Sequence, residues 1–317
     1  MKPDEVSGGL VGVSRGAFLT ILLFFLAPAI IVYSAFSIFP LLSTILYSTY
    51  DMKSDGSLVN VGLENFRTLL GDPTWSDPFW NAFWNNCVFF LIHMFVQNPI
   101  GIALAALLSL PKLKLRSTYR TLIFMPTMLS VVIIGFVWQL ILSPLWGIAK
   151  GFLNAVSLGF LFAPWLGQEE TALVTLSLIS VWQFVGIPMI LIYTALLAIP
   201  DELTDAATVD GLNQLQIFFW IKLPLILPTI GLVSVLTFVN NFNAFDLIYA
   251  VKGALAGPNF ASDIMGTFFY RTFFGNQLQP GDPTMGATVA TMMFLIILVG
   301  VMIYLFIVQR RMHRYSF

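Results

Sequence analysis

The feature that most constrains this chain is a series of apolar blocks, each long enough to cross a lipid bilayer. Hydrophobic residues make up 58% of the 317 residues and charged residues only 10%, whereas a soluble domain averages about 25% charged residues. A membrane-spanning helix needs about 20 consecutive, mostly apolar residues. Six blocks meet that requirement: residues 18–42, 82–110, 122–142, 171–197, 225–249 and 285–308. The sequence therefore predicts an all-α polytopic membrane protein with six transmembrane helices.

The first block, residues 18–42, follows the basic residues Lys2 and Arg15, as the apolar core of a signal peptide does. Its apolar stretch is longer than a signal peptide needs and no clear cleavage site follows, so we expect a retained anchor. The single cysteine, Cys87, lies in the second block and is expected to pack as a small buried side chain. We expect one transmembrane domain over residues 1–317, surrounded by lipid bilayer. The net charge of −1 gives no reason to expect a nucleic acid partner.

Lysine and arginine residues predict which loops face the cytoplasm, because cytoplasmic loops are enriched in them. Two segments without acidic residues carry the basic clusters: Lys112, Lys114, Arg116 and Arg120 after the second block, and Arg310, Arg311 and Arg314 near the C-terminus. With six spans, both clusters are cytoplasmic if both termini are cytoplasmic. Loops 50–81, 143–170 and 250–284 then lie outside, and loop 198–224 lies inside.

Four tryptophans near the predicted outer surface are expected to form an aromatic belt at the membrane interface: Trp75, Trp80, Trp84 and Trp146. Residues 146–158 are expected to form a short helix lying in that interface, with Trp146 as its anchor.

Loop 198–224 contains the acidic stretch DELTDAATVDGLNQLQIFFWIKLP, which begins at Asp201. Pro200 should end the preceding helix, and Asp201 and Glu202 should open a new one, because acidic side chains favour the positive end of a helix dipole. Gly211 is a natural stop, and a second short helix over 214–222 should end at Pro224. The stretch is thus predicted to form two short helices joined at a glycine. It is either a docking surface for a partner or a solvated amphipathic connector.

The residues of this elbow resemble a known motif. Asp205-Ala206-Ala207 followed by Asp210-Gly211, with Leu223-Pro224 further on, is similar to the EAA loop in the membrane subunits of binding-protein-dependent ABC importers. Asp205 stands where that loop usually has glutamate. Four other segments are similar to permeases of the carbohydrate-uptake importers, the family of the maltose-transporter permease: VGLENFRTLL at 61–70, WNAFWNNCVFF at 80–90, YRTLIFMPTMLSVVIIGFVWQLI at 119–141 and GFLN at 151–154.

The resemblance implies a type I ABC importer permease fold in a bacterial inner membrane. It also implies three partners: a second, homologous permease, a dimer of cytoplasmic ATPases and an external solute-binding protein. The elbow would dock on the ATPase through Asp205, Ala206, Ala207, Asp210, Gly211, Leu223 and Pro224. The sequence contains no G-x-x-x-x-G-K-[ST] motif, so ATP and Mg are expected on the partner and no cofactor on this chain. The implied solute is a sugar or sugar derivative, with a polyol or glycerol phosphate as the alternative.

Polar residues inside the apolar blocks are candidates for the solute pathway, because such residues are costly in lipid. In the fifth block they are Thr237, Asn240, Asn241, Asn243 and Asp246, with Phe245 beside them; in the fourth they are Trp182, Gln183 and Phe184, before a helix break expected at Pro188. If the fifth block is one helix, then Thr237, Asn241 and Phe245 share a face. The alternative is hydrogen bonding between helices or simple packing.

Three polar residues of the second block, His93, Gln97 and Asn98, form another cluster, in which the histidine is expected to be a structural hydrogen-bonding group. Neither metal-ligand spacing nor a catalytic constellation is visible. A membrane enzyme is therefore not predicted. A secondary transporter or channel is a weaker alternative, because we find no internal repeat and only one acid, Asp246, well inside a block.

Overall fold

The structure, a computed structural model, describes residues 15–53, 55–110 and 113–309. Within these residues it is helical except for one two-stranded antiparallel hairpin and connecting loops. Lys2, Lys112, Arg310, Arg311 and Arg314, which helped to predict the orientation, lie outside the described residues.

The first half of the described chain contains α1 Arg15–Tyr33, α2 Phe39–Tyr47, β1 Tyr50–Met52, β2 Leu58–Asn60, α3 Glu64–Gly71, α4 Pro73–Ile92, α5 Asn98–Leu108, α6 Arg116–Phe124, α7 Val131–Ile141 and α8 Ile148–Ala155. The second half contains α9 Glu169–Phe184, α10 Gly186–Leu197, α11 Asp201–Val209, α12 Gln214–Ile217, α13 Leu223–Leu225, α14 Leu227–Phe242, α15 Asp246–Lys252, α16 Met265–Phe274 and α17 Pro283–Ile303. Short π-helical and 3₁₀ segments connect several of these helices.

The six predicted apolar blocks correspond to six helical stretches that are long and apolar enough to cross a membrane. Four are single stretches, the third of which is interrupted after Phe242: 24–47, 73–108, 227–252 and 283–306. Two are bent pairs, α6 with α7 at 96° and α9 with α10 at 41°. The prediction of an all-α, six-span membrane protein is confirmed.

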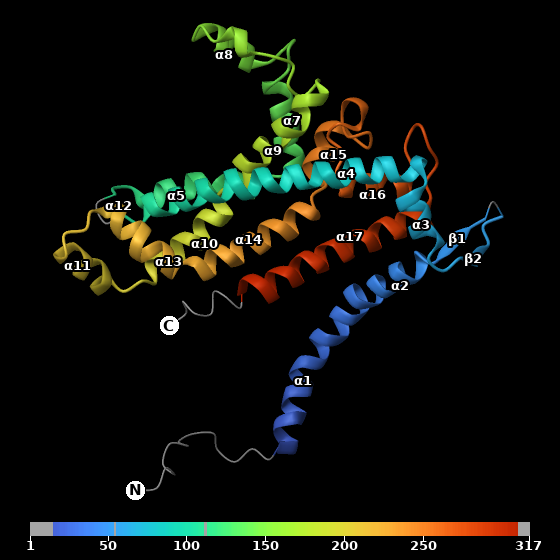
Figure 1. Ribbon diagram of the computed structural model, residues 1–317, viewed down its shortest axis with the longest axis horizontal. Coiled ribbons are helices and arrows are strands. Elements are labelled where there is room, and N and C mark those ends of the chain that lie inside the picture. The colour runs from blue at the N-terminus through green and yellow to red at the C-terminus, as the bar shows by residue number, and fades with distance from the viewer. Residues whose placement is uncertain (1–14, 54, 111–112, 310–317) are drawn as a thin grey trace.

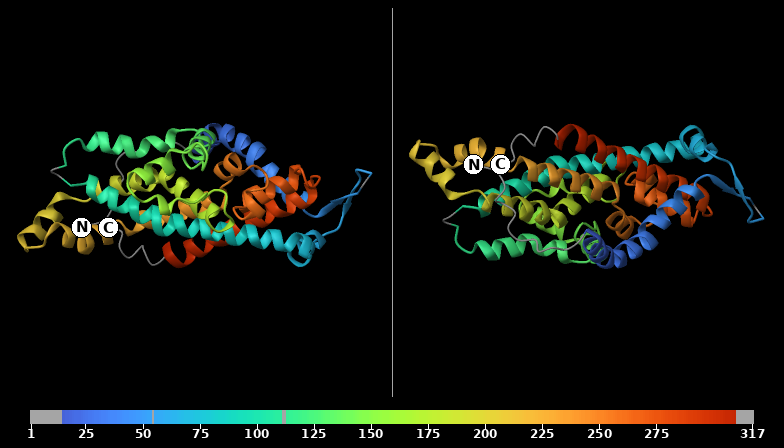
Figure 2. Two further views of the ribbon diagram at one scale, coloured as in Figure 1. Left: turned by 90° about the horizontal axis from the view of Figure 1, so that it is seen from above. Right: turned by 90° about the horizontal axis from the view of Figure 1, so that it is seen from below.

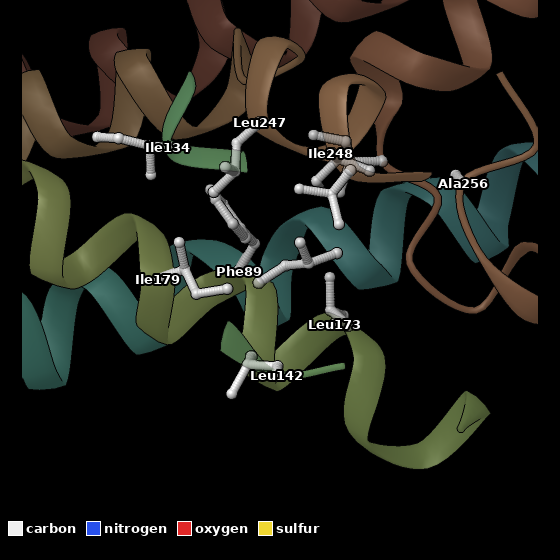
Figure 3. Close-up of a cluster of buried hydrophobic side chains, with 11 residues drawn as sticks. Phe89, Ile134, Leu142, Leu173, Ile179, Leu247, Ile248 and Ala256 are labelled. Atoms are coloured by element: carbon white, nitrogen blue, oxygen red, sulfur yellow. The ribbon is translucent and has the colours of Figure 1, made fainter. Parts of the chain in front are cut away.

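The long helix made of α4 and α5 runs through the bundle, with α10, α14 and α17 beside it (Figure 1). In contrast, α1 and α8 project away from the bundle in opposite directions (Figure 1), and the views from above and below in Figure 2 look along those directions. One buried cluster holds α4, α7, α9 and α15 together through residues that include Phe89, Ile134, Ile179 and Leu247 (Figure 3). Many large apolar side chains elsewhere are exposed, as expected for helices that face lipid.

Three of the four π-helical segments in the described residues precede a proline by the same spacing. They are Ser34–Ile38 before Pro40, His93–Gln97 before Pro99 and Phe218–Lys222 before Pro224. In each case the residue directly before the proline donates its N–H to the carbonyl five residues earlier. Because proline has no N–H to donate, the wider π turn lets the helix pass the proline without stopping.

The π-helical segment Phe218–Lys222 corrects the predicted end of the second elbow helix. Pro224 does not end it, because the helical path continues from α12 through the π-helical segment into α13 and stops at Leu225. The third block was also predicted as one span over 122–142, but it begins earlier, at Arg116, and bends sharply where the segment Met125–Met128 separates α6 from α7. In the fourth block the bend falls at Val185, so that Pro188 lies in the first turn of α10.

The short helix predicted after Trp146 is present as α8, residues Ile148–Ala155. Trp146 is exposed, as are Ile148 and Phe152 on the helix itself. At the end of the molecule away from α11, the hairpin of β1 and β2 is fixed to α3 by Asn65, whose Nδ2 donates to the carbonyl oxygens of Ser48 and Tyr50.

Candidate functional site

A polar cavity of about 380 Å³ lies inside the helix bundle where the α14 helix is interrupted. Residues from α4, α7, α9, α10, α14 and α15 and the segments between them enclose it. The lining residues are Phe89, His93, Gln97, Val131, Ser180, Phe184, Ile187, Pro188, Leu191, Val233, Leu236, Thr237, Asn240, Asn241, Asn243, Ala244, Phe245, Asp246, Leu247 and Ile248. The cavity therefore combines amide and hydroxyl groups with apolar and aromatic surface and contains no basic lining side chain other than the imidazole of His93.

Most of the predicted pathway residues meet in this cavity. Those that line it are Phe184, Thr237, Asn240, Asn241, Asn243, Phe245 and Asp246. Gln183 is fully buried outside the lining, where its Nε2 lies 3.3 Å from the carbonyl oxygen of Leu129. Trp182 is 45% exposed on another face of α9 and packs edge to face with Trp138. The sequence had not singled out Ser180, although it lines the cavity.

The interruption between α14 and α15 places Asn243, Phe245 and Asp246 in the cavity. The span predicted over 225–249 is present, but it is not one unbroken α-helix, because α14 ends at Phe242 and α15 begins at Asp246. Gly266, at the start of α16, packs directly against the interruption: a Cβ atom there would lie 2.3 Å from the carbonyl oxygen of Ala244. A glycine from a distant segment thus permits the close approach that supports the break.

Asp246 stands in the first turn of α15, where the helix dipole favours a carboxylate. Its side chain is exposed, and it has no hydrogen-bond or ion-pair partner among the described residues. It is the one carboxylate among the lining residues of this cavity.

His93 forms the opposite wall together with Ser180. Its Nδ1 lies 2.8 Å from the carbonyl oxygen of Phe89, which can only accept, so Nδ1 carries the proton. Its Nε2 therefore accepts from the Ser180 hydroxyl at 2.9 Å. Both ring nitrogens are engaged within the chain, which agrees with the predicted structural role of this histidine.

Two lining residues retain unsatisfied groups. Gln97 Oε1 and Asn241 Oδ1 are buried and have no hydrogen-bond partner among the described residues. The other amide of this cluster, Asn98, is satisfied, because its Oδ1 accepts from the Thr237 hydroxyl at 3.2 Å. Buried polar atoms in proteins are nearly always paired, so each exception needs an explanation.

The second candidate site is the elbow formed by α11, Gly211 and α12, which lies at one end of the bundle (Figure 1). Gly211 has φ +84°. The N–H of Leu212 bonds to the carbonyl of Ala207 at 3.0 Å, and that of Gly211 to the carbonyl of Thr208 at 3.1 Å. These two bonds form a Schellman motif, which ends α11 with a residue in the left-handed region.

A capping box then starts α12. The Asn213 side chain accepts from the backbone N–H of Gln216 at 2.9 Å, and the Gln216 side chain accepts from that of Asn213 at 2.8 Å. The predicted pair of short helices joined at a glycine is therefore present. The capping box was not predicted, although the N-x-x-Q spacing at 213–216 is a readable signal for it.

The surface of the elbow is acidic and partly apolar. Its four carboxylates, Asp201, Glu202, Asp205 and Asp210, are exposed and have no ion-pair partner among the described residues. Neither Asp205 nor Asp210 meets a basic residue within the described chain. Ala206 is exposed, whereas Ala207 is only 4% exposed. Of the two alanines, Ala206 is thus the one available to a partner.

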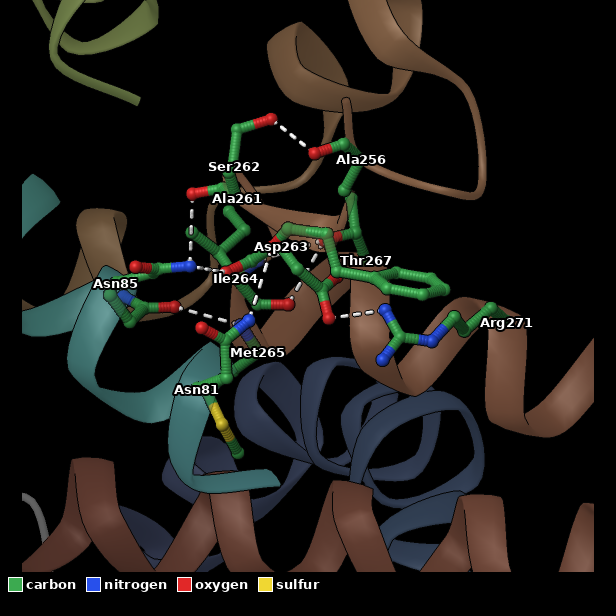
Figure 4. Close-up of polar contacts among 12 residues, drawn as sticks. Asn81, Asn85, Ala256, Ala261, Ser262, Asp263, Ile264, Met265, Thr267 and Arg271 are labelled. Carbon is green, nitrogen blue, oxygen red and sulfur yellow. Dashed lines mark hydrogen bonds and ion pairs between the residues drawn. The ribbon is translucent and has the colours of Figure 1, made fainter. Parts of the chain in front are cut away.

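A polar network at the far end of the molecule connects the segment before α16 to α4 (Figure 4). Arg271 pairs with the fully buried Asp263, which also accepts a hydrogen bond of 2.7 Å from the Thr267 hydroxyl. Asn85 of α4 donates to the carbonyl oxygens of Ala261 and Asp263. This network was not predicted, because its charged members are separated by eight residues and lie in a loop region that carried no motif.

The membrane-length helices, the polar cavity within them and the exposed elbow at one end define a membrane transport subunit. The chain belongs to the family described as binding-protein-dependent transport system inner membrane component, whose model matches residues 97–314, more than half of the chain. The match contains both the cavity lining of α9 to α15 and the elbow.

Several characterised or named relatives are similar over most of their length. The probable ABC transporter permease protein YurN of Bacillus subtilis is 31% identical over 258 residues, which cover 80% of this chain and 86% of the relative. The arabinooligosaccharides transport system permease protein AraP of Bacillus subtilis is 26% identical and covers 87% of this chain and 84% of the relative. The lactose transport system permease protein LacF of Rhizobium radiobacter is 28% identical, with coverage of 79% and 82%.

Among solved structures, a chain of a bacterial alginate ABC transporter in complex with an alginate-pentasaccharide-bound periplasmic protein has the same fold. Its TM-score is 0.77 at 21% identity, with 92% of this chain and 95% of that chain covered. The comparison confirms the predicted ABC importer permease fold.

Proposed function

We propose that this chain is the membrane-spanning subunit of an ATP-driven importer for a sugar or sugar derivative. The observation that carries the proposal is the exposed elbow, in which an Asp-Ala-Ala helix ends in a Schellman motif at Gly211. The elbow docks on a dimer of cytoplasmic ATPases, which bind ATP and Mg, while this chain binds no cofactor. A second, homologous permease completes the pathway, and an external binding protein delivers the solute.

The coupling step uses Asp205, Ala206, Asp210 and Gly211 at the docking surface. Ala207, Leu223 and Pro224 hold the elbow to the bundle, because Ala207 is buried and the helical path continues through the other two. Closure of the ATPases moves the elbow, and with it α14, whose cavity residues follow directly in the chain. Both termini and the elbow lie in the cytoplasm, as the basic clusters predict.

The composition of the cavity supports a hydroxyl-rich solute. Amides both donate and accept hydrogen bonds, and Phe184 and Phe245 offer the apolar surface that sugar rings pack against. Asp246 disfavours glycerol phosphate, because its carboxylate would repel the phosphate group. No lysine or arginine lines the cavity to offset these negative charges. The names of relatives that transport lactose or arabinooligosaccharides agree with this class of solute.

The proposal is tested in vesicles that contain the whole importer, assembled from the products of the genes beside this one. Uptake of radiolabelled neutral sugars is measured with and without ATP, and with the membrane potential collapsed. We expect uptake that needs ATP and the ATPase subunits and survives loss of the potential. Uptake that follows the potential and continues without the ATPase would identify a secondary transporter instead.

A further inference from the structure

A second cavity, of about 390 Å³, lies at the end of the molecule opposite the elbow. The first turns of α4 form one side of it through Trp75, Asp77 and Asn81, and the segment around α16 forms the other through Phe260, Arg271 and Gln279. We propose that this outer pocket is a binding site for a neutral sugar, separate from the cavity in the bundle. The assignment of a sugar rests on the proposed function, and the pocket itself is defined by these residues alone.

The outer pocket offers several hydrogen-bonding groups that the chain does not use. The Asp77 carboxylate and the Gln279 side-chain amide have no hydrogen-bond partner among the described residues. Asn81 donates its Nδ2 to the carbonyl oxygen of Phe260 at 3.1 Å, which leaves its side-chain oxygen as an acceptor. Acceptors and donors from two separate segments thus converge on one space, as in sites for hydroxyl-rich ligands.

Aromatic surface lies next to these polar groups, because Trp75 and Phe260 also line the outer pocket. The C–H faces of sugar rings are apolar and pack against such rings, while their hydroxyls need the polar groups. A lipid chain would not satisfy Asp77, Asn81 and Gln279, since it offers no hydrogen-bonding group.

The floor of the outer pocket is rigid. The Arg271 guanidinium lies between the rings of Phe260 and Phe268, at 4.5 Å and 4.9 Å from their centroids, and is paired with the buried Asp263. Phe260 has a left-handed backbone with φ +56°, which is costly for a residue with a large side chain. The Asn81 hydrogen bond and the Arg271 contact hold it there, so the pocket is shaped before a ligand arrives.

Charge indicates which sugars fit. The charges of Arg271 and Asp263 offset each other, so the one unpaired charge among the six residues named above is the Asp77 carboxylate. An anionic sugar would meet repulsion there, whereas a neutral sugar would find an acceptor for its hydroxyls. The outer pocket therefore takes neutral sugars in preference to uronates.

The test measures sugar binding to the purified full-length chain in lipid nanodiscs by saturation-transfer NMR and tryptophan fluorescence. The probes are maltose, lactose, sucrose and trehalose, together with methyl glucoside and methyl glucuronide, which differ only in the carboxylate. The pocket variants are Asp77→Ala and Gln279→Ala, which remove exposed groups without breaking a hydrogen bond of the chain. The control is Gln277→Ala, a neighbour outside the lining, and Asn243→Ala reports separately on sugar binding in the bundle cavity.

We expect saturable binding of at least one neutral sugar, weakened about fivefold by each pocket variant, as for loss of one hydrogen bond, and unchanged by Gln277→Ala. The proposal is overturned if none of the neutral probes binds, if Asn243→Ala alone abolishes binding, or if the glucuronide binds as well as the glucoside. It is also overturned if the pocket variants bind sugar normally and, in a separate assay of the assembled importer, change only the stimulation of the ATPase by the external binding protein, which would identify a protein-docking surface. Sugar binding is measured without the partner subunits, so a negative result there counts against the outer pocket alone. A failure of ATP-driven uptake in the assembled importer would count against the proposed function.

Discussion

The side chain of Asn86 on α4 joins the interruption of α14 to the start of α16. Its Nδ2 donates to the carbonyl oxygen of Asn241 at 3.0 Å, and its Oδ1 accepts from the backbone N–H of Met265 at 3.1 Å. Asn86 is fully buried, so neither bond exchanges with water. One amide therefore connects the wall of the bundle cavity to the segment that also forms the outer pocket.

Replacing Asn86 with alanine is expected to destabilise the protein by about 2–3 kcal/mol, because the buried N–H of Met265 loses its partner and the carbonyl of Asn241 loses the bond from Asn86 while keeping that from Ala244. The measurement is thermal unfolding of the purified protein in nanodiscs. The matched control is Asn81→Ala, which removes one hydrogen bond from an exposed residue and should cost about 1 kcal/mol or less. Equal effects of the two substitutions would contradict the bridging role of Asn86.

Replacing Asp246 with asparagine tests whether its carboxylate faces the solute in the bundle cavity. The side chain is exposed and unpaired among the described residues, so folding should be unaffected. We expect the maximal rate of ATP-driven sugar uptake to fall about tenfold, since a charge-assisted hydrogen bond is replaced by a neutral one. Asp51→Asn, at an exposed acid of the β1 strand, is the control and should transport normally. An unchanged rate for Asp246→Asn would place the solute path elsewhere.

Local sequence signals predicted the elbow well, because its turn depends on residues close to one another. Gly211 is required by a Schellman motif that involves only the preceding helix and the next residue. The orientation of that helix was not predictable in the same way. Which of Ala206 and Ala207 faces the bundle depends on how α11 docks against the rest of the molecule, and the sequence pattern treats both alike.

The sequence did not predict the interruption after α14, because this feature also depends on contacts with distant parts of the chain. The residues Asn243, Ala244 and Phe245 include neither proline nor glycine, and they continue an apolar block of membrane length. The groups that support the break come from elsewhere in the chain: Gly266 packs against Ala244, and Asn86 binds the Asn241 carbonyl. The polar residues of the cavity were found from their cost in lipid, but their arrangement depends on these distant contacts.

Replacing Gly211 with valine is expected to disrupt the elbow and uncouple the importer. A Cβ atom at Gly211 would meet nothing within 4 Å, so the penalty comes from φ +84° and not from a collision. Gly151→Val in α8 is the matched control, because a Cβ atom there also meets nothing and its φ is not positive. We expect Gly211→Val to lower sugar uptake per ATP hydrolysed, or to prevent binding of the ATPase, while the control behaves as the natural protein. Normal coupling in Gly211→Val would refute the docking role of the elbow.

Asp263 predicts a pH dependence of stability. Burial raises the pKa of its carboxyl from the usual 3.8 to about 6, against the opposing pull of Arg271 and the Thr267 hydrogen bond. Between about pH 4 and pH 6 the folded protein therefore holds a proton that the unfolded chain has released, so the stability from this group is lost as the pH rises through that window. A shift of this size corresponds to about 2–3 kcal/mol.

The check compares the melting temperature of the natural protein with that of Asp263→Asn at pH 4.5 and pH 7. Asp263→Asn carries a neutral side chain at both values, as protonated Asp263 does, so the fall in melting temperature between pH 4.5 and pH 7 should be smaller in the variant. Asp51→Asn, which changes an exposed carboxylate, should keep the pH dependence of the natural protein. If the natural protein instead gains stability relative to Asp263→Asn as the pH rises, the attraction of Arg271 outweighs burial and Asp263 ionises below its usual pKa.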